Sequence, residues 1–136
     1  MHRADIVIVG AGAAGAMAAL AATEQGASFV GLDQLPEFGG TAIVSGGGMS
    51  IAGTSMQGER GIEDSPDLAF HDMVDPQTEA DEAWGRFYYD LGAEELFEWL
   101  RRQGVEFTAI TISESDSVPR RHVPKGTGLG LMTRLW

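Results

Sequence analysis

The chain has 136 residues, contains no cysteine, and carries a formal net charge of −11, from 9 Lys and Arg against 20 Asp and Glu. This length suits one domain, and the negative field repels phosphate backbones and anionic lipids, so we expect neither nucleic acid nor a membrane as a partner. Without cysteine there are no disulfides, thiolate nucleophiles or thiolate metal sites, and we expect a cytoplasmic protein.

The first 33 residues predict a β–α–β unit. Residues 5–9 (DIVIV) are apolar and β-branched at consecutive positions, which is typical of a strand buried on both faces of a parallel sheet. The alanine-rich segment that follows favours a helix ending at Gly26. Residues 27–33 (ASFVGLD) then predict a second strand, reached by a connection long enough for a parallel crossover.

Gly10, Gly12 and Gly15 form a G-x-G-x-x-G motif between the first predicted strand and the helix. The first glycine permits a tight turn, the second lets a pyrophosphate approach the backbone, and the third lets the helix pack closely on the strand. Asp33 ends the second strand, where a carboxylate accepts hydrogen bonds from ribose hydroxyls and repels a 2′-phosphate. The motif therefore predicts an NAD or FAD site, and the alternative is a tight turn that binds no ligand.

The middle of the chain predicts a loop and then a helix. Residues 39–61 are glycine-rich with weak periodicity, so we expect a long ordered loop that can include a short helix. Ser65 and Pro66 have the residue types of an N-cap and a first helical position, and Asp75-Pro76 stops that helix.

The remainder predicts two helices, a strand and a basic loop. Residues 79–103 carry the helical pattern, with a break near Gly92 and Gly104 beyond the end. Residues 105–112 predict a strand. Residues 120–130 read as a glycine-bearing basic loop that leads into an amphipathic end.

Histidines and arginines give two candidate sites. His122 follows Arg120 and Arg121, a group that can hold an anionic substrate or a phosphate, although we interpret it as a solvated basic loop. His71 and Asp72 are expected to form a surface pair on a helix. No residue pattern places a catalytic side chain or a metal site.

Acidic and aromatic residues surround the predicted start of the later helices. We interpret the acidic run as a solvated turn and helix start, since carboxylates are favoured at helix N-termini. We expect the aromatic residues to lie in the core or on a contact surface for another domain. The acidic residues are Asp75, Glu79, Asp81 and Glu82, and the aromatic residues are Trp84, Phe87, Tyr88 and Tyr89.

Taken together, these segments resemble a known family. Residues 7–33 (VIVGAGAAGAMAALAATEQGASFVGLD) and 39–54 (GGTAIVSGGGMSIAGT), with Gln57 and GIEDSPD at 61–67, are similar to the FAD-binding family of fumarate reductase, succinate dehydrogenase flavoprotein and 3-ketosteroid dehydrogenase. The resemblance extends from about residue 4 to the end, through WLRRQGVEF at 99–107 and an R-x-H…G…L pattern that reaches residue 131.

The resemblance implies a set of cofactor-binding residues. In this family the second glycine cluster carries backbone N–H groups to the pyrophosphate and the isoalloxazine ring, which explains five glycines within residues 39–50. A flexible glycine linker is the alternative. The implied FAD-binding residues are Gly10, Gly12, Ala13, Ala14, Gly15, Asp33, Gln34, Gly39, Gly40, Thr41, Ala42, Ser45, Gly46, Gly47 and Gly48.

The chain departs from the family pattern in three respects. Asp33 stands where the family more often has Glu, one methylene longer. The histidines are His2, His71 and His122, so none lies near the second cluster where some members bind FAD covalently, and a non-covalent FAD is expected. Members are several times longer, so we expect residues 1–136 to be the N-terminal part of an FAD-binding domain, with the substrate domain absent.

The expected fold class is α/β, with a Rossmann-like β-α-β core and an appended helical segment, incomplete relative to the family fold. Residues 1–60 would supply the β–α–β unit and the flavin loop, and residues 61–136 a mostly helical continuation. The resemblance implies an FAD-dependent oxidoreductase that transfers hydride to or from an activated C–C bond of a small-molecule substrate. The alternatives are a non-catalytic dinucleotide-binding module and an NAD-dependent dehydrogenase. An incomplete sheet would also favour self-association.

Overall fold

A computed structural model describes residues 3–74 and 81–136, and the chain forms two compact units. The first unit comprises the chain up to Gly47 together with Pro124–Trp136. The second unit comprises Gly48–Val123. The chain therefore leaves the first unit in its glycine-rich segment and returns to it near the C-terminus.

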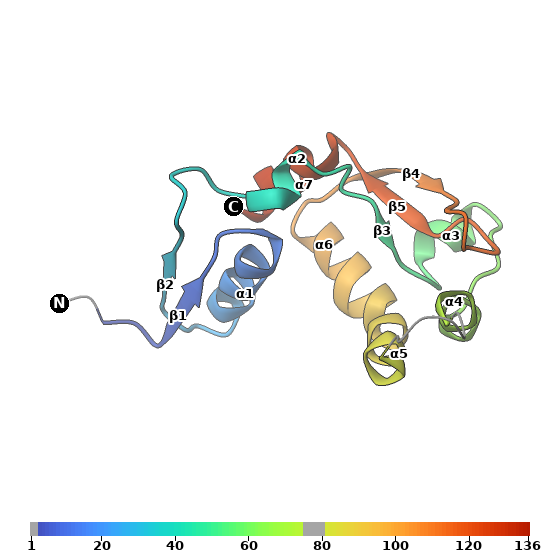
Figure 1. The fold of residues 1–136 in the computed structure, drawn as a ribbon, viewed down its shortest axis with the longest axis horizontal. Helices are drawn as coiled ribbons and strands as arrows, with labels where there is room; N and C mark the ends of the chain where they lie inside the picture. The colour runs from blue at the N-terminus through green and yellow to red at the C-terminus, as the bar shows by residue number, and fades with distance from the viewer. Residues whose placement is uncertain (1–2, 75–80) are drawn as a thin grey trace. The chain divides into compact units, whose positions relative to one another are not determined.

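The first unit begins with the predicted β–α–β arrangement (Figure 1, blue). Strand β1 (Ile6–Val9) and strand β2 (Phe29–Leu32) pair in parallel, with Ile6 opposite Phe29, and helix α1 (Ala13–Glu24) connects them. Gly26 follows α1 with φ +74, as expected for a glycine beyond a helix C-terminus.

The strands of this unit are more exposed than their apolar sequence predicts. Val7 is 62% exposed and Val9 is 82% exposed, so the expectation of a strand buried on both faces is wrong for this chain. The sheet of the described residues has two strands, and α1 packs against both of them, which leaves the remaining apolar surface uncovered.

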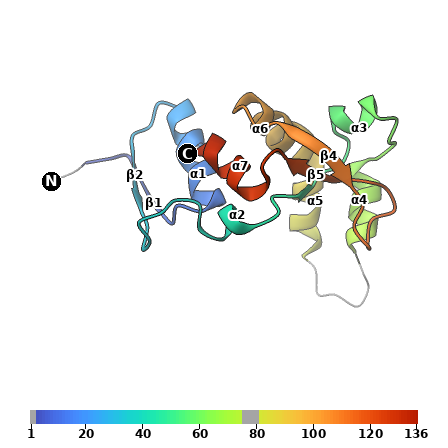
Figure 2. The same cartoon turned by 90° about the horizontal axis from the view of Figure 1, so that it is seen from above.

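Two further helices complete the first unit. Helix α2 (Gly40–Val44) packs against helix α7 (Thr127–Leu135), and the two lie side by side in Figure 2. Helix α7 also contacts α1. The buried apolar side chains of the unit come from α1 and α7. They are Ala16 and Ala22 of α1, and Leu131, Met132 and Leu135 of α7.

The second unit contains a three-stranded sheet in the order β3-β5-β4. Strand β4 (Phe107–Thr111) confirms the strand predicted over residues 105–112. Strand β3 (Met49–Ser50) pairs antiparallel with β5 (Arg121–Pro124), so that Met49 lies opposite His122. Residues expected to form a basic loop are therefore a strand followed by α7.

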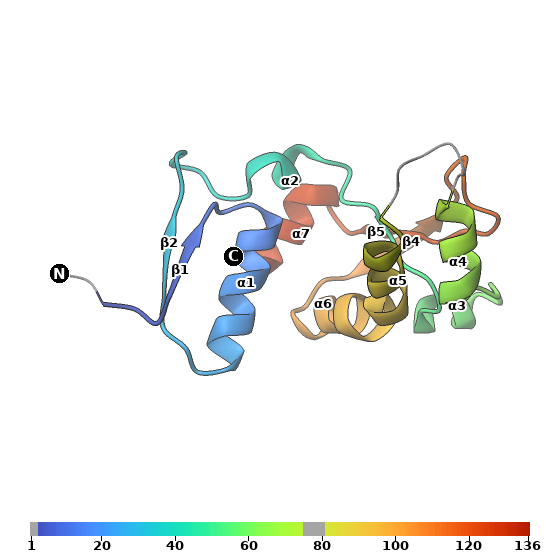
Figure 3. The same ribbon diagram turned by 60° about the horizontal axis from the view of Figure 1, so that its bottom comes forward.

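The remaining helices belong to the second unit, and α4 (Pro66–Met73) packs against α5 (Glu82–Leu91) (Figure 3). Helix α4 begins as predicted, with the Ser65 side chain accepting a hydrogen bond from the backbone N–H of Leu68. The predicted stop at Asp75-Pro76 lies outside the described residues, as do Glu79 and His2. Helix α3 (Ser55–Glu59) is short, and with α2 and β3 it replaces much of the loop expected for residues 39–61.

The predicted break near Gly92 does not occur. Gly92 keeps right-handed helical angles, φ −59° and ψ −37°, so α5 continues into the π-helical segment η1 (Gly92–Glu98) and then into α6 (Trp99–Arg102). Glycine permits a helix break but does not require one.

The core of the second unit is larger than that of the first. Tyr89 is buried, which fits the expectation that the aromatic residues lie in the core. Trp84 and Phe87 of α5 are instead 68% and 58% exposed. The buried apolar residues of this unit are Ile51, Ala52, Ala69, Tyr89, Phe97, Leu100 and Val105.

Candidate functional site

The G-x-G-x-x-G motif forms the turn between β1 and α1. Gly10 has φ +103, a conformation that side chains disfavour, and its N–H donates to the carbonyl of Leu32 in β2 at 2.7 Å. A Cβ atom on Gly15 would overlap the carbonyl oxygen of Gly10, so only glycine permits this approach of helix and strand. Gly10 and Gly15 are therefore required by the turn itself, with or without a ligand.

Gly12 is different, because the turn does not require it. Its φ of −77° is open to any residue, and no described atom lies within 4 Å of a Cβ built on it. Gly12 is also the N-cap of α1, and no described side chain caps that helix. The first N–H groups of a helix need an external partner. The space and the uncapped donors at Gly12 therefore suit an anionic ligand such as a pyrophosphate.

Asp33 lies directly after β2 and holds the glycine turn in place. Its Oδ2 accepts a hydrogen bond from the N–H of Ala11 at 2.5 Å, and its Oδ1 accepts from the N–H of Leu35 at 2.8 Å. The bond from Ala11, followed by that from Leu35, lowers the pKa of the Asp33 carboxyl. The side chain is therefore an ionised acceptor at neutral pH, as a contact to ribose hydroxyls requires.

The second glycine cluster begins beside the first. The N–H of Gly39 donates to the carbonyl of Ala11 at 2.8 Å, and a Cβ on Gly40 would lie 3.6 Å from the Cα of Gly12. Gly39, with φ +98, is the N-cap of α2, and no described side chain caps this helix either. Two helix N-termini without a side-chain cap thus lie close together in the first unit, and each begins at a glycine.

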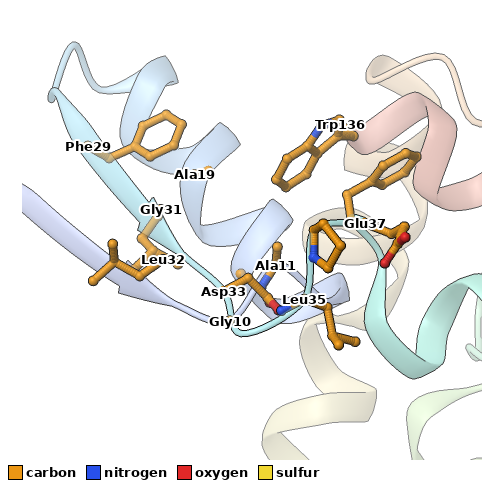
Figure 4. Close-up of a pocket in the computed structure, with 14 residues that line it drawn as sticks. Gly10, Ala11, Ala19, Phe29, Gly31, Leu32, Asp33, Leu35, Glu37 and Trp136 are labelled. Atoms are coloured by element: carbon orange, nitrogen blue, oxygen red, sulfur yellow. The ribbon is translucent and has the colours of Figure 1, made fainter.

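A cavity of about 150 Å³ lies next to this turn (Figure 4). Asp33, Gly10 and Ala11 lie together in the wall, while Phe29 and Trp136 line the cavity from opposite sides. A second, more open hollow has Gly10, Asp33 and Gln34 in its lining. Both hollows meet the carboxyl ends of β1 and β2, which is where open α/β sheets bind their ligands.

The structure brings together most of the residues that the sequence selected. Ala13, Ala14 and Gly15 form the first turn of α1, and Thr41 and Ala42 lie in α2. Ser45, Gly46 and Gly47 follow α2 and still belong to the first unit, whereas Gly48 is the first residue of the second unit.

His122 and Arg120 are not part of a solvated loop, and that interpretation is wrong. Both side chains are 0% exposed. The imidazole Nδ1 of His122 lies 2.7 Å from the carbonyl of Arg120 and its Nε2 lies 2.8 Å from Oγ1 of Thr54. Since a carbonyl can only accept a hydrogen bond, Nδ1 carries the proton. The pKa of His122 is lowered, and burial of the ring is the largest cause of this shift.

Arg120 is the centre of a buried ion-pair cluster with three carboxylates. Its guanidinium lies 3.0 Å from Asp64, 2.6 Å from Asp72 and 3.3 Å from Asp116. Burial opposes ionisation of Asp72, but hydrogen bonds from Ser117 and Arg120 outweigh it and lower the pKa of Asp72. Asp72 thus pairs with Arg120 rather than with exposed His71, which corrects the expected surface pair.

Each of these buried polar side chains has a hydrogen-bond or ion-pair partner among the described residues. In the part of the chain that the structure describes, no group of three or more His, Cys, Asp or Glu side chains is arranged to hold a metal ion. The same residues include no helix long and apolar enough to cross a membrane.

Sequence reasoning missed Phe38 and Trp136, whose rings stack with centroids 5.3 Å apart and planes 13° apart in the lining of the cavity. Phe38 directly precedes the second glycine cluster, which was the available signal. No local pattern links it to Trp136 at the other end of the chain, so the pair could not be found from spacing alone.

Comparisons with known proteins match the chain to one family. Residues 5–131 match the family described as FAD binding domain. A KsdD-like steroid dehydrogenase of Mycolicibacterium smegmatis is 33% identical over 150 residues, which covers 97% of this chain and 27% of that protein. A fumarate reductase (cytochrome) of Shewanella frigidimarina is 35% identical over 128 residues, which covers 93% of this chain and 22% of that protein.

Solved structures give the same result. The open conformation of a flavocytochrome c3 fumarate reductase superposes with a TM-score of 0.89 at 30% identity, over 97% of this chain and 24% of that one. A 3-ketosteroid-Δ4-(5α)-dehydrogenase from Rhodococcus jostii RHA1 superposes with a TM-score of 0.84 at 28% identity, over 97% of this chain and 35% of that one. The chain thus spans about a quarter of the length of the relatives that it matches.

Proposed function

The chain belongs to the FAD-binding domain family, and from this premise we propose that it supplies the FAD-binding portion of an oxidoreductase that acts on an activated C–C bond. FAD as the cofactor follows from the family and from both groups of relatives, and it confirms the expectation from the sequence. The observation that carries the proposal is a pair of helix N-termini whose N-cap residues are glycines and which have no described side-chain cap, beside the ionised carboxylate of Asp33.

We assign the adenosine and pyrophosphate contacts to the first glycine cluster. The N–H groups in the first turn of α1, from Ala13 to Gly15, would donate to the pyrophosphate, because they have no capping side chain among the described residues. Asp33 would accept hydrogen bonds from the ribose hydroxyls, and Gln34 lines the same hollow. The short side chain of Asp33 is already held by Ala11 and Leu35, so the ribose must approach the carboxylate from its remaining lone pairs.

We assign the second glycine cluster partly to the phosphates and partly to the flavin end of the cofactor. Gly39, Gly40, Thr41 and Ala42 form the start of α2 and would approach the phosphates, since this helix start lies against Gly12. Residues 45–48 would lie along the flavin ring and donate to it from backbone N–H groups. Only residues without bulky side chains allow the backbone to come so close to the ring. Bound FAD supplies a ring that accepts or donates a hydride, and the chain's part is to position that ring and keep it in one orientation.

The flavin is proposed to bind non-covalently. A covalent attachment would need a nucleophilic side chain beside the ring, and the histidines described in the chain are exposed His71 on α4 and buried His122, whose ring nitrogens both have partners. The substrate would be a small molecule such as the steroids or fumarate on which the named relatives act. Residues that transfer protons to a substrate would come from outside the two glycine clusters.

Reconstitution with FAD tests the proposal directly. The purified chain, mixed with FAD and desalted, should retain flavin absorption between about 350 and 500 nm, and acid precipitation should release the flavin into the supernatant. Flavin that stays with the precipitate would contradict non-covalent binding, and NADH binding without flavin retention would favour an NAD-dependent dehydrogenase.

The same preparation separates an enzyme from a binding module. The FAD-loaded chain is incubated either with fumarate and a reduced dye, whose oxidation is followed, or with a 3-ketosteroid and an oxidised dye, whose reduction is followed. Turnover with either substrate supports oxidoreductase activity in this chain. Retained flavin without turnover would limit the role of these 136 residues to binding FAD.

A further inference from the structure

Helix α7 contacts the second glycine cluster through backbone atoms. The N–H of Gly128 donates to the carbonyl of Ser45 at 3.1 Å. A Cβ on Gly128 would overlap the carbonyl oxygen of Ala42 and would lie 2.7 Å from Oγ of Ser45. Gly128 is buried, so its hydrogen atom faces the end of α2 and no larger side chain fits between the two segments.

Gly47 makes the reciprocal close approach from the other side. It has φ +68, and a Cβ built on it would lie 2.8 Å from the backbone N of Gly128. The N–H of Gly47 donates to Oγ of Ser45 at 3.1 Å, and that hydroxyl donates to the carbonyl of Ala42 at 2.8 Å. The segment Ser45–Gly47 is therefore fixed by its own hydrogen bonds and by the backbone of α7.

The start of α7 has an unusual conformation that serves this contact. Gly126 has φ +76 and Thr127 has φ +57, and Thr127 is the one non-glycine residue with a positive φ among those described. A β-branched residue in this region is strained and persists only where the surroundings impose it. The strained turn delivers the N–H of Gly128 to Ser45.

The far end of α7 holds the other end of the same cluster. Trp136 follows α7 and stacks on Phe38, the residue before Gly39, with ring centroids 5.3 Å apart. Helix α7 and Trp136 at its end thus contact the chain just before the segment Gly39–Gly47 and near the end of that segment. That segment contains most of the glycines assigned to the flavin side of the cofactor.

From these contacts we propose that Gly128 is a positioning residue for the flavin-binding segment Ser45–Gly47, with α7 as its support. The role rests on the proposed function, because it needs the flavin to lie along that segment. Gly128 would act through the backbone of Ser45 and Gly47, and it would leave the first glycine cluster unaffected. It should therefore affect the affinity for FAD more strongly than that for ADP, which carries the adenosine and the pyrophosphate but no flavin.

Titration of the chain with FAD and with ADP tests this role. The substitution Gly128→Ala forces the end of α2 away from α7, and we expect it to raise the Kd for FAD about tenfold or more while the Kd for ADP changes by less than about twofold. Leu129→Ala is the matched control, because Leu129 is the next residue of α7 and is 54% exposed. It should leave both affinities unchanged. Equal weakening of FAD and ADP by Gly128→Ala would mean general destabilisation and would overturn the role.

A variant without a steric clash and a measurement without FAD keep the test decisive. Ser45→Ala removes the two hydroxyl hydrogen bonds and should weaken FAD by a smaller factor in the same direction. In the ligand-free chain, Gly128→Ala should speed amide hydrogen exchange in residues 43–48, at the end of α2 and after it, but not in α1. Unchanged exchange there would refute the support by α7. If the wild-type chain itself did not bind FAD, the proposed function would be refuted instead.

Discussion

The helices of the two units begin in different ways. In the first unit, the N-cap residues of α1, α2 and α7 are Gly12, Gly39 and Gly126, and no described side chain caps any of these helices. In the second unit, α3, α4 and α5 start at Thr54, Ser65 and Asp81, whose side chains each accept a backbone N–H. A side-chain cap contributes about 1 kcal/mol, so the first unit lacks a source of stability that the second unit uses repeatedly.

Charge at the helix starts follows the same division. Asp67 and Glu82 lie in the first turns of α4 and α5, where a carboxylate interacts favourably with the helix dipole. None of the described helices of the first unit has an acidic residue in its first turn. The buried polar side chains are also found in the second unit: Thr54, Gln57, Arg120 and His122. The second unit satisfies its own polar groups, whereas the helix N-termini of the first unit have no described side-chain cap, and two of them carry the donors that we assign to the phosphates of the cofactor.

Breaking the buried ion-pair cluster should have the largest effect. Arg120→Met leaves Asp64, Asp72 and Asp116 buried around an uncharged side chain, and we expect it to lower the free energy of unfolding by about 3–5 kcal/mol. Urea denaturation measures this loss. Arg86→Met is the control, since the pair of Arg86 with Asp67 is exposed and should contribute no more than about 1 kcal/mol. Equal losses in the two variants would contradict the importance of burial.

Overpacking the β1–α1 turn is the next largest change. The substitution Gly15→Ala places a Cβ against the carbonyl of Gly10, and we expect about 1–3 kcal/mol of destabilisation together with loss of FAD binding. Hydrogen exchange should show the loss of protection first in α1. Gly58→Ala in α3 is the control, because no described atom lies within 4 Å of its added Cβ. That variant should be neutral or slightly stabilised.

Asp33→Asn removes an acceptor oxygen that serves both the glycine turn and the proposed ribose contact. The amide offers one acceptor in place of two, and we expect the Kd for FAD to rise about tenfold in a fluorescence titration. Asp5 provides the control, since it also lies in the first unit, also accepts hydrogen bonds, from Ser28, and also has a lowered pKa. If Asp5→Asn weakened FAD as much as Asp33→Asn, a direct ribose contact would be wrong.

Acidification should weaken the second unit, with the smallest expected effect. Burial lowers the folded-state pKa of His122, so below about pH 6.5 the unfolded chain binds a proton that the folded chain does not. Stability should therefore decrease as the pH falls from 6.5 toward the folded pKa, by at most about 1.4 kcal/mol per pH unit. Denaturation at several pH values measures this slope. It should shrink in His122→Gln, and a slope that persists would assign the effect to other groups.

The sequence predicted the local parts of the fold well. The β–α–β unit, the Ser65 cap, the glycines beyond α1 and α6, and β4 all depend on residues close together in the chain. The position of Gly10, Gly12 and Gly15 in one turn, with Asp33 at its edge, follows from the same short-range geometry. These features needed no knowledge of distant contacts.

The errors concerned contacts between distant segments. The sequence indicates a solvated Arg120 because its partners Asp64 and Asp72 lie 56 and 48 residues earlier in the chain. The break at Gly92 was wrong because a glycine can remain helical when its neighbours continue the helix. The sequence also gives no sign of the contact between Ser45 and Gly128, because these residues are far apart in the chain and spacing does not show which distant residues face each other.

Substitution of Gly12 tests the central claim most directly, because Gly12 is the glycine that the turn does not require. The FAD affinity and the melting temperature of the wild type and of Gly12→Ala are measured side by side. We predict an unchanged melting temperature without FAD and a Kd for FAD raised about a hundredfold, since the added methyl group occupies the space assigned to the pyrophosphate. Unchanged FAD affinity in Gly12→Ala would contradict the proposed site.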